Sequence, residues 1–260
     1  MSTDLVDYRP AGHELRLTMN RPDKRNALSR ELIAALIAAF ERGRDDPTIR
    51  CVVLTGAGSV FCAGMDLTEL SETIEAERAV IWDDALRLGR LFDLIYTLPK
   101  PTIAVVNGAA VAGGAGLVSV CDLAVAVPAA KFGYPEVRRG LVAAMVLPHL
   151  MRHVGERSAR HLLLTGEMID AAEALRVGFV NAVVPAEQID AVTAGWVQSV
   201  AEGGPLALAA TKDLLRQFSR QALSVEEAAQ ASAAPRLTDE CRAGLRAFFS
   251  KEAPPWTRSR

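Results

Sequence analysis

The sequence has little of what marks several common classes of protein. Aromatic residues make up 5% of its 260 residues, and acidic and basic residues nearly cancel, at a formal net charge of -2. Its densest basic stretch, RPDKRN at 21–26, is short enough to be a single loop. Because nucleic-acid binding needs a basic patch or stripe, we expect no nucleic-acid partner. The first ten residues include two aspartates and no apolar segment, so they lack the pattern of a secretory signal and we expect a cytoplasmic protein.

Metal-binding and nucleophile motifs are absent as well. The four cysteines have no metal-ligand spacing, and we expect them to be free thiols in a reducing compartment. His149 and His153 form an i, i+4 pair without the glutamate of an HExxH motif, and no GxSxG motif is present. The sequence therefore predicts no metal, no bound cofactor and no serine-hydrolase nucleophile.

The longest uncharged segment does not have the composition of a membrane span. It runs from Pro101 to Cys121 and contains most of the glycine-rich stretch NGAAVAGGAGLVSVCD at 107–122. A membrane span is densely filled with Leu, Ile and Phe, whereas the glycines and alanines here make the segment only weakly apolar. We therefore expect no association with a membrane.

The same glycine-rich stretch can be compared with two phosphate-binding motifs. Gly108 and Gly113 have the separation of a P-loop, but Gly114 stands where that loop has its lysine. A dinucleotide fingerprint that starts at Gly114 fails at its third glycine, which here is Ser119. The remaining interpretation is that TIAVV at 102–106 is a buried strand. Its following glycines would then let backbone N–H groups approach a ligand closely, as in an anion or oxyanion site.

Strand and helix patterns alternate along most of the chain. Ser29 is placed to cap the helix ELIAALIAAFER (31–42), with Glu31 in its first turn. This alternation predicts an α/β protein with a largely parallel sheet and helices outside it. The expected strands are 14–20, 49–56, 102–106 and 123–127. After Ala186 the patterns are helical only, and the expected helices are 187–201, 205–218, 225–233 and 238–250.

Two of the expected strands end in loops that contain glycine, GAGSVFCAGMDL at 56–67 and NGAAVAGG at 107–114. Ligands of parallel sheets collect at the carboxyl ends of the strands. Two such loops can direct two N–H groups at one carbonyl oxygen. Loss of one donor from an oxyanion hole of this kind typically costs about 2.7–4 kcal/mol of transition-state stabilisation. Tight turns with no catalytic role are the alternative explanation of both loops.

Several stretches, taken together and in order, resemble the crotonase or enoyl-CoA hydratase/isomerase superfamily. They are MNRPDKRNALS, VFCAGMDL, AVVNGAAVAGGAGLVSVCDLAVA, KFGYPEVRRGL, LLLTGEMIDAAEALRVGFVNAVVP and GLRAFFSKEAPPW. The resemblance implies the ClpP/crotonase-like fold of repeated ββα units, with a core over 1–195 that carries a CoA-thioester site. It also implies a C-terminal helical oligomerisation region over 196–260, and a trimer or a dimer of trimers.

The resemblance also implies the site residues. The thioester carbonyl of an acyl-CoA would lie between the N–H groups of Met65 and Gly113, with Glu136 of YPEVRRG as the acid/base; coenzyme A is then part of the substrate rather than a cofactor. Phe248 and Lys251 match an ending that in relatives can reach the CoA of a neighbouring subunit. The other positions expected at the substrate are Arg25, Ala27, Ala63, Asp66, Leu67, Gly114, Gly116 and Pro135. Two simpler roles stay open: Asp66 as a helix cap, and Glu136 as an acid at a helix start after Pro135.

The chain departs from the family pattern at Gly116, where many hydratases have a first glutamate. With Glu136 alone, the chemistry can be a proton shuttle, as in the Δ3,Δ2-enoyl-CoA isomerases. The chain is also similar to the methylglutaconyl-CoA and isohexenylglutaconyl-CoA hydratases, which have glycine at this position. We therefore expect a hydro-lyase of the enoyl-CoA hydratase type, with an isomerase as the alternative and a non-catalytic acyl-CoA- or RNA-binding protein as the alternative of another class. Gly116 is expected to leave room for a branched acyl group or a water.

Overall fold

The computed structural model describes residues 4–218 and 224–253. Their main sheet has six strands in the order β1-β2-β3-β5-β7-β10. β1 and β2 pair antiparallel as a hairpin, and the remaining neighbours are parallel, as predicted. The strands are β1 Val6–Ala11, β2 Glu14–Met19, β3 Cys51–Gly56, β5 Thr102–Val106, β7 Leu123–Ala126 and β10 Ala182–Val183.

A second, smaller sheet is formed by short strands that follow the main ones in sequence. Its order is β4-β6-β8-β9, with the first three strands parallel and the last antiparallel. The strands are β4 Val60–Cys62, β6 Ala109–Val111, β8 Lys131–Gly133 and β9 Met168–Asp170. A main-sheet strand, a short strand and then a helix therefore follow one another three times, which is the repeated ββα unit of the crotonase fold.

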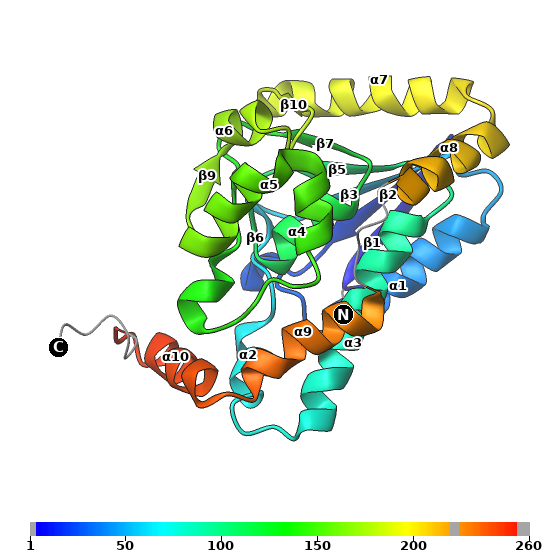
Figure 1. The fold of residues 1–260 in the computed structure, drawn as a ribbon. Helices are drawn as coiled ribbons and strands as arrows, with labels where there is room; N and C mark the ends of the chain where they lie inside the picture. The colour runs from blue at the N-terminus through cyan, green and yellow to red at the C-terminus, as the bar shows by residue number, and fades with distance from the viewer. Residues whose placement is uncertain (1–3, 219–223, 254–260) are drawn as a thin grey trace.

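Helices cover both faces of the main sheet. Figure 1 shows α7 along one face, and α1 and α4 on the other. The α-helices are α1 Arg30–Asp45, α2 Leu67–Glu72, α3 Arg78–Thr97, α4 Gly113–Val120, α5 Leu147–Thr165, α6 Ala171–Arg176, α7 Ile189–Glu202, α8 Pro205–Phe218, α9 Val225–Arg236 and α10 Asp239–Phe249; the 3-10 helices are η1 Pro22–Lys24, η2 Pro135–Arg139 and η3 Ala186–Gln188. Ser29 caps α1 as expected, because its hydroxyl accepts a hydrogen bond from the N–H of Leu32 at 3.2 Å.

The core lies between these layers. Every residue of β5 is buried, as in a parallel strand covered on both faces. The expected boundary between residues 195 and 196 falls inside α7, which packs against β3, β5 and β7. The last seven residues of the expected C-terminal region, including PPW of the family ending, lie outside the described residues.

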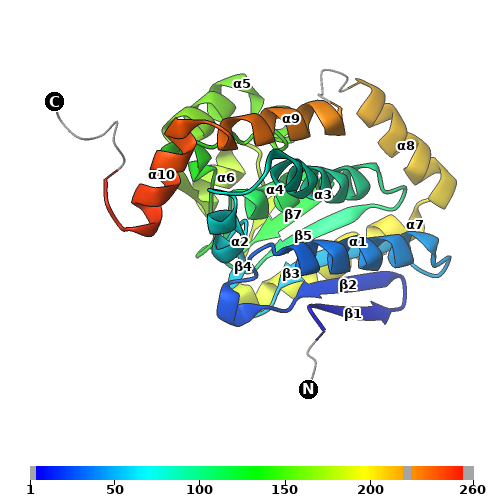
Figure 2. The ribbon, with the colours of Figure 1, turned by 90° about the horizontal axis from the view of Figure 1, so that it is seen from below.

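The C-terminal helices pack back onto their own chain. α9 lies along α3 (Figure 2), and a small apolar cluster joins Ile81 and Ala85 of α3 to Ala229 and Ala233 of α9. α10 lies next to η2, and its Cys241 and Leu245 form a small apolar cluster with Leu70 of α2. α2 and α10, which are far apart in the sequence, therefore meet beside η2, the segment that carries Glu136.

Candidate active site

The two glycine-bearing loops meet, as the sequence predicts. The first loop is held by the chain that precedes α1, because Leu28 and Met65 form a parallel bridge. In it the N–H of Leu28 donates to the Gly64 carbonyl at 2.8 Å, and the N–H of Asp66 donates to the Leu28 carbonyl at 3.0 Å. Gly64 has φ +91°, and a Cβ there would lie 2.9 Å from the carbonyl oxygen of Val111. Only glycine allows both this backbone conformation and this close approach.

Two backbone N–H groups are left free where the loops meet. The bridge uses the carbonyl of Gly64 and the N–H of Asp66, but not the N–H of Met65. Gly113 is the first residue of α4, and the first N–H groups of a helix have no partner within it. Neither N–H donates to another backbone group of the described chain. Met65 and Gly113 both line one cavity of about 110 Å³. The residue before α4, Ala112, has φ 51° and ψ -121°, a rare conformation for a non-glycine residue and of the kind that clusters at functional sites.

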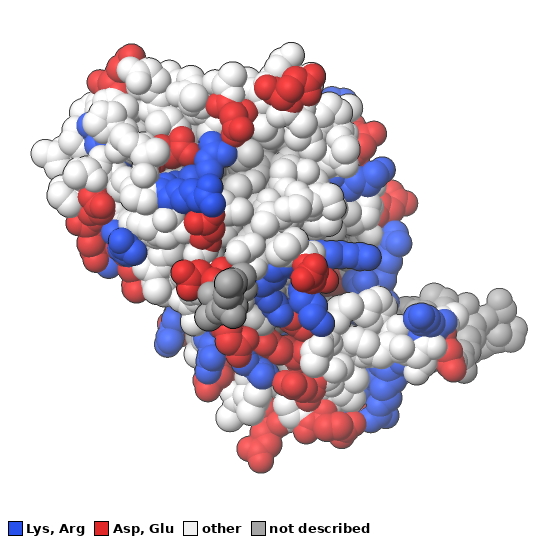
Figure 3. Space-filling view, turned by 180° about the vertical axis from the view of Figure 1, so that it is seen from behind, with Lys and Arg blue, Asp and Glu red and all other residues white. Residues whose placement is uncertain are grey.

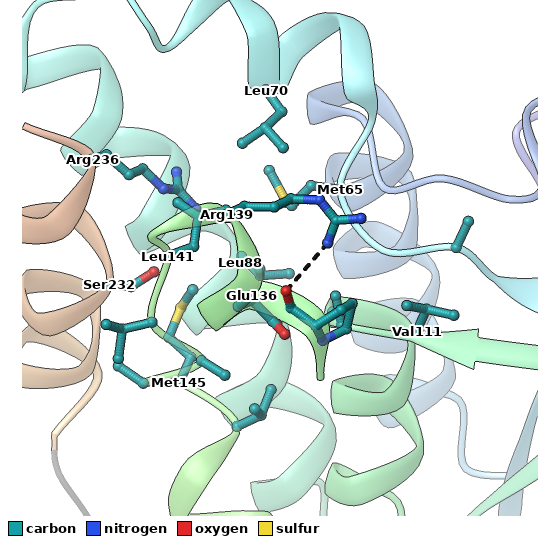
Figure 4. Close-up of a pocket in the computed structure, with 18 of the residues that line it drawn as sticks. Met65, Leu70, Leu88, Val111, Glu136, Arg139, Leu141, Met145, Ser232 and Arg236 are labelled. Carbon is teal, nitrogen blue, oxygen red and sulfur yellow. Dashed lines mark hydrogen bonds between the residues drawn. The ribbon is translucent and has the colours of Figure 1, made fainter. Parts of the chain in front are cut away.

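Glu136 lies in the same cavity (Figure 4). It follows Pro135 at the start of η2, as the helix-start interpretation expects, yet its side chain lines the cavity. Its Oε2 atom is buried without a hydrogen-bond partner in the described chain. Burial raises the pKa of Glu136 to about 7, against the lowering effects of a backbone hydrogen bond and of the Arg139 and Arg236 charges. A carboxyl group with a pKa near neutrality can both accept and donate a proton at neutral pH.

The rest of the cavity wall is mainly apolar, with two arginines that the sequence patterns did not reveal. Leu88, Phe92 and Met145 contribute apolar surface, and Arg139 and Arg236 contribute charge. Arg139 is three residues after Glu136, on the same short helix, which is a local signal that could have drawn attention to it. Arg236 comes from the far end of α9, and no local pattern connects it to Glu136.

A second cavity, of about 420 Å³, adjoins the first. Both are lined by Glu136, Leu141, Val142 and Ala143, and the larger one continues over apolar side chains of α5 such as Leu147 and Leu163. Glu136 therefore stands between a small cavity with charged groups and a larger apolar one.

Only some of the expected substrate contacts line the small cavity. Ala63, Leu67 and Pro135 line the small cavity. Gly114 does not line it. A Cβ at Gly114 would lie 2.2 Å from the Cys62 carbonyl oxygen, so this glycine permits close packing of α4 on β4. Arg25 and Ala27 belong to the loop beside the cavity, where the Arg25 carbonyl accepts a hydrogen bond from the N–H of Ala63 at 3.0 Å.

That loop is held rigid by a residue that sequence reasoning missed. Asn26 is fully buried with φ 53°, and its side chain donates to the carbonyls of Ala57 and Val60 at 2.9 and 2.7 Å and accepts from the N–H of Arg21 at 2.9 Å. The Arg25 loop is therefore fixed against the β3–β4 connection, and its position as a candidate CoA contact is defined by the fold.

Asp66 is a helix cap. Its carboxylate accepts from the N–H of Thr68 at 3.0 Å at the start of α2 and pairs with Arg21 at 2.9 Å, and it is not among the residues that line the cavity. Burial raises the pKa of Asp66, but these hydrogen bonds and the Arg21 charge outweigh it and the pKa is lowered. An ionised, fully engaged carboxylate outside the cavity does not fit the role of a second acid.

Gly116 differs from its expected role. A Cβ added there would lie 2.6 Å from both Phe92 Cζ and Val146 Cγ1, and these two side chains, not Gly116, line the cavity. The space beside Gly116 is thus filled by the phenyl ring rather than open to an acyl group or a water. This correction arises because α3 supplies a ring whose position no pattern around residue 116 could predict.

One of the two C-terminal candidates, Phe248, reaches the site region within its own chain. The Phe248 ring lies under the Arg139 guanidinium, with 4.2 Å between the Arg139 Cζ atom and the ring centroid. Lys251 is exposed and has φ 58°, just after the end of α10. Contact of these residues with the CoA of a neighbouring subunit stays a prediction.

Other kinds of site find no support in the described part of the chain. No group of three or more His, Cys, Asp or Glu residues there could hold a metal ion, and no described helix is long and apolar enough to cross a membrane. The face shown in Figure 3 carries acidic and basic side chains interspersed, without a basic stripe.

Comparisons with known proteins identify the family of the chain. Residues 15–259 match the family model described as "Enoyl-CoA hydratase/isomerase". The chain is 42% identical to a "Putative enoyl-CoA hydratase" of Thermus thermophilus, over 94% of this chain and 97% of that protein, and 37% identical to "Enoyl-CoA hydratase EchA19" of Mycobacterium tuberculosis, over 96% and 94%. It is similar to the crystal structure of an enoyl-CoA hydratase from Mycobacterium avium, with a TM-score of 0.85, 35% identity and coverage of 98% and 100%. The chain belongs to the enoyl-CoA hydratase/isomerase family.

Proposed function

We propose that the protein adds water across the 2,3-double bond of an enoyl-CoA thioester, or removes it in the reverse direction. The observation that carries this proposal is Glu136. Among the described residues it is the one carboxylate that lines the small cavity, and it shares that cavity with the free N–H groups of Met65 and Gly113. The names of the hydratases to which the chain is similar support the same reaction.

In this reaction Glu136 acts first as a base and then as an acid. Its carboxylate takes a proton from water while the water oxygen bonds to C3, and the electrons of the double bond move to the thioester oxygen. The two N–H groups hold the resulting enolate oxygen. The protonated Glu136 then returns the proton to C2, so that one water has been added and the carboxylate is restored. The pKa of about 7 suits both steps.

The second candidate is Δ3,Δ2-enoyl-CoA isomerisation, which the surroundings of Gly116 favour. Phe92 and Val146 fill the region that a second carboxylate would occupy on α4, so Glu136 has no acidic partner there. Removal of a proton from C2 by Glu136 and its return to C4 moves the double bond with no gain or loss of atoms. The enolate would be held by the same two N–H groups.

Assembly and location remain part of the proposal. We expect a trimer or a dimer of trimers, in the cytoplasm. Within the expected oligomerisation region, α10 already buries Leu245 within its own chain. α8 leaves Leu206, Leu214 and Phe218 exposed, with 85%, 54% and 90% of their surfaces accessible, and supplies the better candidate surface.

The reaction can be tested directly. But-2-enoyl-CoA is hydrated with loss of the absorbance of the conjugated thioester, and hex-3-enoyl-CoA is isomerised with a gain of it. The panel should also contain branched and carboxylated 2-enoyl-CoAs. Hydration of any member that is lost in Glu136→Gln but kept in Glu240→Gln, an exposed glutamate on α10, supports a hydratase. Turnover of 3-enoyl substrates alone would show an isomerase, and binding without either reaction would show a non-catalytic protein.

A further inference from the structure

Arg236 is a buried cation in which two of the three guanidinium nitrogens have no hydrogen-bond partner among the described residues. The residue is 6% exposed, and the two nitrogens are Nε and Nη1. Its side chain lines the small cavity together with Glu136. An unpaired buried charge is costly to the folded protein, so a guanidinium in this position indicates an anion that is supplied by something else.

A second cation, Arg139, adds to the positive charge in the cavity that has no matching anion. Arg139 lines the same cavity, and its Nε atom is also buried without a partner. Its Nη1 makes one long hydrogen bond, 3.4 Å, to the Pro135 carbonyl, and its guanidinium lies over the neutral Phe248 ring. Figure 4 shows Arg236 directed towards Arg139, and Arg139 extending over Glu136.

The acidic groups near Arg236 do not supply the missing charge. Asp84 is engaged by the Arg30 guanidinium through two hydrogen bonds of 2.8 Å. The Arg139 and Arg236 charges lower the pKa of Glu136, but the buried Oε2 atom of Glu136 accepts no hydrogen bond from either arginine. Burial raises the pKa of the Cys241 thiol, which therefore stays neutral. Two guanidinium groups thus face a cavity whose own single carboxylate is needed for the reaction.

We propose that the natural substrate carries a carboxylate on its acyl chain and that Arg236, with Arg139 beside it, binds this carboxylate. Ser232, one turn earlier on α9, lines the cavity next to Arg236 and adds a hydroxyl group to the same wall. A guanidinium binds a carboxylate through two parallel hydrogen bonds, which gives orientation as well as affinity. This inference rests on the proposed CoA-thioester site but not on the direction or type of the reaction there.

A phosphate of CoA is the other anion that could meet these arginines. The two arginines line the same cavity as Glu136, whereas the expected CoA contact, Arg25, does not line this cavity and touches its wall through the hydrogen bond from Ala63. An anion at Arg236 therefore lies in the cavity of the proposed acid/base, Glu136, where the acyl part of the substrate would react. The experiment separates the two sources by holding the CoA part constant.

The test measures binding of saturated acyl-CoAs, which cannot react. Dissociation constants of succinyl-, glutaryl- and adipyl-CoA are compared with those of neutral analogues in which an isopropyl group replaces the terminal carboxylate. We expect at least one dicarboxylic chain to bind the wild type about ten- to a hundredfold more tightly than its neutral analogue, as for a hydrogen bond to a charged group. In Arg236→Met this preference should be lost, while binding of the neutral analogue stays within about threefold of wild type.

The matched control is Arg246→Met, on α10, whose side chain is 62% exposed and pairs with Glu75 outside the cavity. It should keep the full preference. The proposal is overturned if the wild type prefers none of the three dicarboxylic chains, or if Arg236→Met keeps the preference. An equal loss for charged and neutral chains also overturns it, because the arginine then contacts CoA or only maintains the cavity. If the carboxylate preference is found but no hydration or isomerisation occurs, the proposed reaction fails and this inference stands.

Discussion

Replacement of Glu136 by glutamine should separate the chemistry of this site from its structure. Glutamine keeps the shape of the side chain and removes the group that moves the proton. We expect kcat to fall by 10²- to 10⁴-fold, the usual range for general acid–base catalysis, with the dissociation constant of a saturated acyl-CoA nearly unchanged. In the wild type, kcat/KM for hydration should rise with pH as Glu136 loses its proton near pH 7, and then level off.

The same substitution should also change how the stability of the protein depends on pH, because Glu136 is buried. In the folded protein the pKa of Glu136 is raised from 4.5 to about 7, so the folded state holds a proton that the unfolded chain has lost between those values. Stability therefore falls as the pH rises through this window, by up to about 3 kcal/mol from this group. Glu136→Gln should remove that part of the pH dependence, measured as the free energy of unfolding in urea from pH 4.5 to 8.

Two results would refute this reasoning. Retention of more than about a tenth of wild-type kcat would mean that Glu136 is a structural acid at the start of η2. An unchanged stability profile in Glu136→Gln, with Glu240→Gln as the exposed control, would mean that the carboxyl group is not held in a low-dielectric environment, and the basis for its raised pKa would be lost.

Three further changes test the surroundings of the site. Asp66→Ala should cost about 1–2 kcal/mol of stability through loss of a helix cap and leave kcat within about threefold of wild type. Asp170→Ala, which removes the cap of α6, is the matched control. A large loss of kcat in Asp66→Ala would mean that Asp66 acts as a second acid. Gly116→Glu should destabilise by about 3 kcal/mol or more, because its Cβ meets Phe92 and Val146, and Phe92→Ala in the same chain should recover part of the loss; a stable single variant with raised hydration would contradict this packing. Light scattering at micromolar concentration should show a trimer or hexamer, and Leu206→Glu with Phe218→Glu should weaken it, whereas a wild-type monomer would exclude the assembly.

The elements that the sequence predicts well are those with a strong local signal. TIAVV at 102–106 coincides with β5, and the pattern at 205–218 coincides with α8. The strands of the second sheet have no comparable signal in the sequence. Each of its strands has three residues, such as VFC of β4 and KFG of β8, and three residues are too few to show a period of two. They become strands because the loops that contain them are stacked by the repeated units of the main sheet.

The site shows the same division. Met65, Gly113 and Glu136 could be placed from motifs, since each belongs to a continuous stretch that resembles the family, and the structure brings all three to one cavity. Arg236 could not. The helical pattern was expected to end at residue 233, and the structure continues α9 through Pro235 to Arg236 in its last turn. Its approach to Glu136, 100 positions earlier in the chain, depends on how α9 packs along α3. No periodicity within either segment contains that information.

The buried Arg236 should also affect stability. Its unsatisfied nitrogens should lower the stability of the unliganded protein, and a bound carboxylate should remove this cost. Arg236→Met keeps much of the side-chain volume and removes a charge whose Nε and Nη1 have no partner, so the unliganded variant should be more stable than the wild type. A gain of about 1 kcal/mol would raise Tm by roughly 2–4 °C in a chain of this size. The dicarboxylic acyl-CoA that the wild type prefers should reverse the order at saturation, because a ligand at a hundred times its Kd adds about 2.7 kcal/mol to the stability of the protein that binds it. If Arg236→Met instead melts below the wild type without ligand, the guanidinium has a partner within the folded protein, and its role is to hold α9 rather than to meet the substrate.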